Sequence, residues 1–255
     1  MTTVQDVFAF INGFAPFAEA LDFDNPGLLA GEGAQPVHTA VLALDITAPV
    51  VEEAVEKGAQ LIVSHHPVIF TPLRKIKRNS VPWLLARHDL SAICAHTNLD
   101  MAPDGGVNDA LSQALGMENC RGICPHGSGF EAMVGDLPNA MEPAAFARHV
   151  KEALHCGAVR FVPGNRPVKT VGICSGAGAD YLEPALSEGA DAFVTGEVKH
   201  HEFLLARELG ATLVEGGHFY TETVVLPVLA KQLEAAFPEV QWLVAESNTA
   251  PEESC

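Results

Sequence analysis

The chain has 255 residues, enough for one large domain or two modest ones, and 48% of them are hydrophobic, as is ordinary for a globular protein. Its formal net charge of −17 disfavours sequence-independent binding to nucleic acid. No apolar run is long enough to span a bilayer, and the N-terminus MTTVQDVFAF does not resemble a signal peptide, so we expect a cytoplasmic protein without membrane contact.

The first strongly patterned stretch, residues 37–63, predicts a strand, a helix and a second strand. The apolar run AVLALD is typical of a buried strand. Thr47 and Pro49 are helix-start signals, and Gly58 suits the left-handed position that ends a helix. The run LIV then predicts the next strand.

Residues 168–194 repeat this pattern, with eight of the 27 aligned positions identical to residues 37–63. LLARHDLSAICAHTNLD and LLARELGATLVEGGHFYTE form a second similar pair, each a helix, a short strand and a polar motif. Helices that alternate with buried strands indicate parallel pairing and right-handed crossovers. We therefore predict an α/β fold of two related, intertwined halves, residues 1–118 and 119–255, with mainly parallel sheets.

Four of the predicted strands end beside imidazoles and carboxylates. These are His65 and His66, then His96 and Asp100, then Glu197, His200 and His201, and finally His218 and Glu222. Ligands of open α/β sheets bind beyond the carboxyl ends of the strands, so we expect a metal site in the cleft between the halves. Nitrogen and oxygen ligands suit zinc, iron, manganese or nickel. The number of these candidate ligands exceeds the number that one metal ion needs, which favours two ions roughly 3.5–4 Å apart.

Structural interpretations compete with the metal interpretation. A lone His-His pair, or a histidine four residues from an acid, is usually structural, and recurrence after strands in both halves is what favours metal binding. For His200 and His201 the evidence is balanced, because VKHHEFLLAREL could be only a helix start.

Three further features leave alternatives open. The Gly-rich CSGAGADY, residues 174–181, could cradle an anion or form a tight turn. RKIKR, residues 74–78, could steer a small anion toward a nearby site or be a solvated loop, the more common case. Cys120 and Cys124 could bind a metal, but the sequence has no second pair of closely spaced cysteines to complete such a site. The scattered cysteines indicate free thiols.

The motifs DNPGLLAGE, ALDIT, GAQLIVSHHPVIF, AHTNLD, GADAFVTGEVKHHE and GGHFYTE occur in this order from Asp24 to Glu222. In these motifs the chain resembles the dinuclear-metal-centre proteins of the NIF-three-like (YbgI-like) family, often labelled GTP cyclohydrolase I type 2 homologues. The resemblance implies two divalent cations per chain and a toroidal homo-hexamer. It assigns the metal ligands to His65, His66, Asp100, His218 and Glu222, and it expects His96 to line the site. Glu131 stands at or beside a position where members commonly have arginine.

The favoured hypothesis is a metal-dependent hydrolase that acts on a nucleotide or a related small molecule, GTP cyclohydrolase-like by resemblance. His96, Glu197 and His200 are the candidates for moving protons to a leaving group. Neither a phosphate-cradling GxxxxGK[ST] motif nor a GxSxG nucleophile motif is present. The alternative is a non-catalytic metal-binding or metal-trafficking ring protein with a regulatory or stress role.

Overall fold

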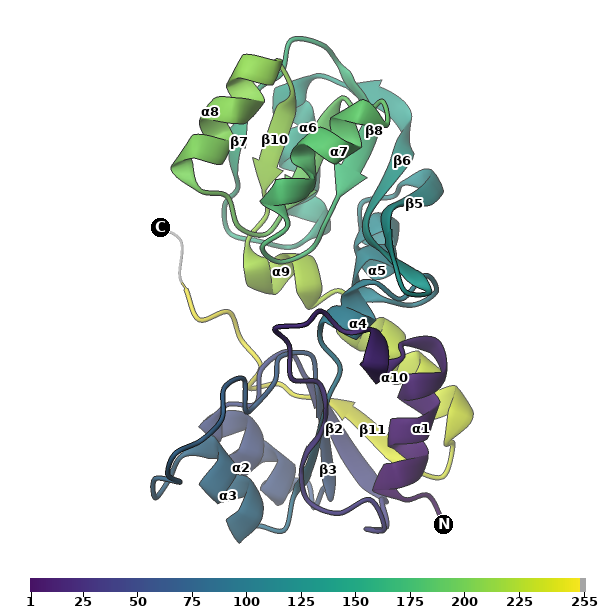
Figure 1. Ribbon diagram of the computed structural model, residues 1–255, viewed down its shortest axis with the longest axis vertical. Helices are drawn as coiled ribbons and strands as arrows, with labels where there is room; N and C mark the ends of the chain where they lie inside the picture. The colour runs from purple at the N-terminus through teal and green to yellow at the C-terminus, as the bar shows by residue number, and fades with distance from the viewer. Residues whose placement is uncertain (253–255) are drawn as a thin grey trace. The chain divides into compact units, whose positions relative to one another are not determined.

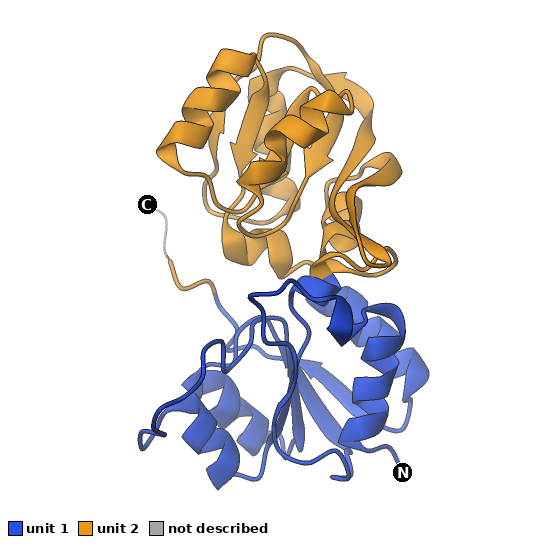
Figure 2. Cartoon of the chain, viewed as in Figure 1, with its two compact units in different colours: residues 1–99, 226–249 blue, residues 100–225, 250–255 orange. Residues whose placement is uncertain are grey.

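The computed structural model describes residues 1–252, which form two compact units (Figures 1 and 2). Unit 1 comprises residues 1–99 together with the returning segment 226–249, and unit 2 comprises residues 100–225 with the chain from residue 250 onward. Each unit contains one β-sheet and its own helices. The predicted halves, residues 1–118 and 119–255, were divided according to the internal repeat and have other bounds than these units. The division into halves stays a prediction.

Unit 1 is built on a five-stranded sheet with the order β1-β4-β3-β2-β11. Its elements are α1 (Val4–Phe14), η1 (Phe17–Glu19), β1 (Gly27–Ala30), β2 (Thr39–Ala43), α2 (Ala48–Glu56), β3 (Leu61–Ser64), α3 (Val81–Arg87), β4 (Ser91–Cys94), α4 (Thr97–Asp100), α10 (Val225–Ala236) and β11 (Gln241–Val244), where Asp100 and Val225 already belong to unit 2. β11, β2, β3 and β4 pair in parallel, and β1 is antiparallel to β4.

Local chemistry explains where the unit 1 helices begin. Thr3 caps α1 and exchanges hydrogen bonds with Asp6, and Thr47 caps α2 two residues before a proline in the first turn. α2 and α3 lie on one face of the sheet and α1 and α10 on the other (Figure 1). Alternate residues of one strand face opposite ways, and both Val41 and Leu42 of β2 are fully buried. The sheet is therefore covered on both faces, as parallel sheets are.

Unit 2 is built on a six-stranded sheet with the order β5-β6-β8-β9-β10-β7. Its elements are α5 (Val107–Ala114), β5 (Glu118–His126), β6 (Gly129–Met141), α6 (Pro143–Ala153), β7 (Arg160–Val162), β8 (Val168–Ile173), η2 (Ala179–Tyr181), α7 (Leu182–Ser187), β9 (Ala192–Thr195), α8 (His200–Leu209), β10 (Thr212–Glu215) and α9 (His218–Glu222). β8, β9 and β10 are parallel, whereas β5, β6 and β7 join by antiparallel pairing.

Two apolar clusters cover the two faces of the unit 2 sheet. Val194 of β9 packs in a cluster with Phe146 and Val150 of α6, whereas its neighbour Phe193 packs with residues of α7 and α8. This alternation is the period of a strand buried on both sides. It holds the parallel strands rigidly, so the loops at their carboxyl ends start from fixed positions.

The predicted α/β class and its repeat are confirmed. Strand, helix and strand occur in both copies, as β2-α2-β3 and as β8-α7-β9, and the second similar pair becomes α3-β4 and α8-β10. The hairpin of β5 and β6, which spans the expected junction between the halves, was not predicted. None of the helices in residues 1–252 has both the length and the apolar character needed to cross a bilayer.

Candidate metal centre

In unit 1, three neighbouring parallel strands place polar side chains at one edge of the sheet. Asp45 follows β2, His65 and His66 follow β3, and His96 follows β4. The strands are in register, with Ser64 opposite Cys94 and Ala43 opposite Ser64, so their carboxyl ends are level. The three imidazole rings then meet, with centroids 5.0–5.4 Å apart.

Each ring of this histidine set, His65, His66 and His96, has its Nδ1 atom engaged by an oxygen acceptor. The acceptors are the Ala95 carbonyl at 2.9 Å, Asp45 Oδ1 at 2.8 Å and Asp24 Oδ1 at 2.8 Å, respectively. An oxygen acceptor requires a proton on Nδ1, which leaves Nε2 of a neutral ring as the atom with a lone pair. This is the arrangement of metal-binding histidines, whose second nitrogen donates to a carbonyl or carboxylate.

The histidine set therefore fits a metal ion in its chemistry and in its spacing. One ligand atom from each of the three residues lies within 4.8 Å of the others. His65 is fully buried, and His66 and His96 are partly buried, so desolvated nitrogen donors face a common point. Nitrogen donors of this kind suit zinc and other transition metals.

Asp24 is the anchor that sequence reasoning missed. Its side chain is fully buried, and besides the His96 ring it accepts hydrogen bonds from the Thr97 amide at 3.0 Å and the Thr97 hydroxyl at 2.6 Å. Burial alone would raise the pKa of Asp24, but the bonds from His96 and Thr97 outweigh it and lower the pKa to about 2. The carboxylate thus stays charged and holds the tautomer of His96. The available signal was its place in the first quoted motif, DNPGLLAGE.

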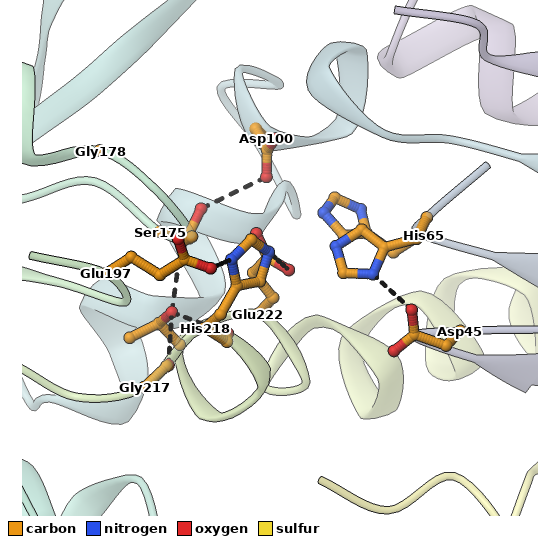
Figure 3. A network of polar contacts seen from close by, with 12 residues as sticks. Asp45, His65, Asp100, Ser175, Gly178, Glu197, Gly217, His218 and Glu222 are labelled. Atoms are coloured by element: carbon orange, nitrogen blue, oxygen red, sulfur yellow. Dashed lines mark hydrogen bonds and ion pairs between the residues drawn. The ribbon is translucent and has the colours of Figure 1, made fainter. Parts of the chain in front are cut away.

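Unit 2 repeats this design at the carboxyl ends of its own parallel strands. Ser175 follows β8, Glu197 follows β9 and His218 follows β10 (Figure 3). His218 Nδ1 lies 2.7 Å from Glu197 Oε1, so Nε2 of a neutral ring is again the nitrogen with a lone pair that could bind a metal. His218 and Glu222 begin and end the single turn of α9, and the four-residue spacing puts both on one face.

The ligand atoms of unit 2 converge on a buried carboxylate. Nε2 of His218 lies 3.0 Å from Oε2 of Glu222, which is 3% exposed. A lone pair and a carboxylate oxygen repel at this distance unless a cation or a proton lies near both. Carboxylate oxygens of Asp100 and Glu222 lie within 4.8 Å of each other, and Ser175 Oγ lies 3.3 Å from Asp100 Oδ1 (Figure 3). The carboxylate set, Asp100, His218 and Glu222, therefore also suits a cation.

Glycines allow the chain to approach this carboxylate. A Cβ on Gly176, whose φ is +57°, would clash with Glu222 Oε1, and one on Gly196 would lie 2.7 Å from the Cα of His218. Two amides of this turn bond to side chains of the protein: Gly176 N donates to Thr221 and Gly178 N to Thr195. In CSGAGADY these two amides are therefore directed at protein, as the tight-turn alternative expects.

The remaining predicted residues lie outside these two sets. His200 and His201 are exposed and open α8, as the helix-start interpretation of VKHHEFLLAREL expects. Burial raises the pKa of the Cys120 and Cys124 thiols, which disfavours the thiolate that metal binding needs, and neither forms a disulfide. Glu131 lies 3.6 Å from His126 Nδ1.

The fold and the two sets define a mixed α/β protein with histidine and carboxylate groups that could hold metal ions at the strand ends. The chain belongs to the Duf34/NIF3 (NGG1p interacting factor 3) family, whose model matches residues 2–251. This confirms the resemblance drawn from the quoted motifs.

Known proteins are similar to this chain over nearly its whole length. A protein of Clostridium acetobutylicum named GTP cyclohydrolase 1 type 2 homolog is 30% identical over 261 aligned residues, covering 97% of each chain. A protein of Clostridium perfringens with the same name is 31% identical, covering 97% of this chain and 98% of the other. The crystal structure of a hypothetical protein of Staphylococcus aureus matches with a TM-score of 0.93 at 30% identity, with 99% of each chain covered.

Proposed function

We propose that this chain binds two divalent metal ions and uses them as a hydrolase acting on a nucleotide or a related compound. The observation that carries the proposal is the shared state of His65, His66, His96 and His218, each of which has Nδ1 against an oxygen acceptor. Folding alone does not need four histidines to present Nε2 at strand ends. The names of the Clostridium relatives support nucleotide chemistry.

The proposed ligands are the five predicted residues, two in the histidine set of unit 1 and three in the carboxylate set of unit 2. They are His65, His66, Asp100, His218 and Glu222. When bound, divalent ions of zinc, iron, manganese or nickel activate water for attack at neutral pH and polarise the group attacked. His96 completes the ring of donors, because Asp24 holds its Nδ1 proton in place.

The proposed proton carrier of unit 2 is Glu197. Its carboxylate orients His218, and 61% of its side chain is exposed, so it connects His218 with solvent. It also lines a cavity of about 260 Å³ with Arg160 and Lys199, next to the exposed His200. Glu197 therefore joins the carboxylate set, through its bond to His218, to a cavity that could admit a small molecule, which supports catalysis over storage.

Metal content tests the site. Protein purified without chelator is expected to contain two divalent ions per chain by elemental analysis, because five ligands exceed what one ion takes. Replacing His65, Asp100 and Glu222 together by Ala should remove them. Unchanged metal content in the folded triple variant would show that the ions bind elsewhere. A screen of the metal-loaded protein against nucleotides, phosphoesters and cyclic amides then tests hydrolysis.

We also propose, from the family resemblance, that the protein assembles as a homo-hexamer. Light scattering at micromolar concentration is expected to give about six times the 27.0 kDa of one chain. A particle of 27 kDa would rule out assembly, and the metal measurement would still stand on its own.

A further inference from the structure

The loop that leaves the histidine set carries the densest positive charge of the chain. Between His66 and His88 there is no acidic residue, and four of the five cations lie close together, at Arg74, Lys75, Lys77 and Arg78. Residues 70–78, called the basic loop here, are all exposed. The chain has 15 basic and 32 acidic residues, so the remainder has 15 − 4 = 11 basic residues and a net charge of 11 − 32 = −21.

The charge of the basic loop is not neutralised by the protein. Among residues 1–252, none of its four cations forms an ion pair or a side-chain hydrogen bond. Arg121, Arg160 and Arg166 show the contrast, since each pairs with a carboxylate within 3 Å. In a chain with so many acids, four neighbouring cations without a partner favour an external anion.

The basic loop is anchored to a distant segment where it begins, a few residues after the proposed ligand His66. Asn25, next to the His96 anchor Asp24, donates from Nδ2 to the Ile69 carbonyl at 2.5 Å. At the other end, Ser80 Oγ donates to the Lys77 carbonyl at 2.7 Å. The exposed Phe70 ring lies edge-on to the ring of His96, with centroids 6.4 Å apart. An exposed aromatic ring thus lies against the histidine set, four residues before the first of the four cations in the sequence.

We propose that the basic loop binds the phosphate groups of a small phosphorylated ligand, and that Phe70 stacks on its planar ring. The inference rests on the proposed function, because the reacting part of the ligand would then lie at the histidine set. Arginine and lysine donate charge-assisted hydrogen bonds to phosphate, and an exposed aromatic ring stacks on a base. A compact anion needs only this local charge, whereas the −21 of the remainder repels an extended polyanion or an anionic membrane.

Charge-removal variants test the phosphate contacts. R74Q/K75Q/K77Q/R78Q removes the four cations, and K57Q/R148Q/R207Q/K231Q removes two arginines and two lysines from other exposed positions. Equilibrium dialysis of inorganic tripolyphosphate, GTP and guanosine is run with metal-loaded and with chelator-treated protein. The loop variant is expected to bind tripolyphosphate and GTP about 10-fold or more weakly, the loss of at least one charge-assisted bond. The control variant should lose less than about 3-fold of its affinity for these two ligands, and guanosine should bind the loop variant and the control equally.

A second pair of variants tests the aromatic contact. Phe70→Leu should lower the affinity for GTP and guanosine by about 5-fold or more. The affinity for tripolyphosphate should not change, because only the ligands with a base can stack. Phe161→Leu, which removes another exposed ring, should change none of the three.

The proposal is overturned if the loop variant and its control lose equal affinity, or if neither loses any. It is also overturned if the loop variant keeps GTP and tripolyphosphate but loses binding to phosphatidylserine vesicles or to a single-stranded oligonucleotide. The metal content of the same samples distinguishes the phosphate site from the proposed hydrolase. If the protein takes up no metal but its basic loop still binds tripolyphosphate, the phosphate site stands and the metal-dependent hydrolase is rejected.

Discussion

Replacing Glu222 by Gln is expected to lower hydrolysis of the substrate by about 100-fold or more, the scale seen when activated water is lost. The carboxylate is buried and lies 3.0 Å from His218 Nε2, so its negative charge falls directly beside a proposed ligand atom. Glutamine keeps the shape and removes the charge, so the fold should persist while one or both ions bind more weakly. Circular dichroism, elemental analysis and the hydrolysis rate of GTP measure the three effects.

Glu53→Gln is the control for charge removal. Glu53 is a partly exposed carboxylate of α2 that accepts hydrogen bonds from Ser247, and it belongs to neither donor set. The Glu53→Gln change should leave the metal content and the hydrolysis rate unchanged. Equal turnover by the wild type and by folded, metal-depleted Glu222→Gln would show that the activity does not come from these residues. The non-catalytic metal-binding protein would then be the better interpretation.

The repeated α/β core was predictable because local signals agree with the fold there. The apolar runs at β2, β3 and β9 and the glycines after α2 and α7 fix where elements begin and end. Residues just past the ends of parallel strands must share one edge of a sheet, so His65 and His96 could be brought together from sequence.

The β5-β6 hairpin and the histidine anchors were not predictable in the same way. β5 buries only Ile123 and contains Pro125, and its pairing with β6 is irregular between Glu118 and Arg121, so it lacks a clean apolar alternation. Asp24 reaches His96 across 72 positions of the chain. Such a contact depends on tertiary packing, which no local pattern encodes.

Gly176→Ala is expected to damage the carboxylate set although it replaces none of the proposed ligands. Gly176 has a φ of +57°, and an added Cβ would clash with Oε1 of Glu222. Ala therefore faces two costs: about 1–3 kcal/mol for a left-handed backbone in a non-glycine residue, and displacement of a buried carboxylate. We expect both a lower free energy of unfolding and a metal affinity reduced by about 10-fold or more.

A matched glycine separates the two costs. Gly116 has a φ of +67° in the same unit, and a Cβ there would meet no atom within 4 Å. Gly116→Ala thus carries the backbone strain alone and should lower the free energy of unfolding while leaving metal content unchanged. Urea unfolding and elemental analysis of both variants decide the point. If the two variants lose equal stability and both keep their metal, the close approach of Gly176 to Glu222 has no part in metal binding, and the carboxylate set must be reassigned.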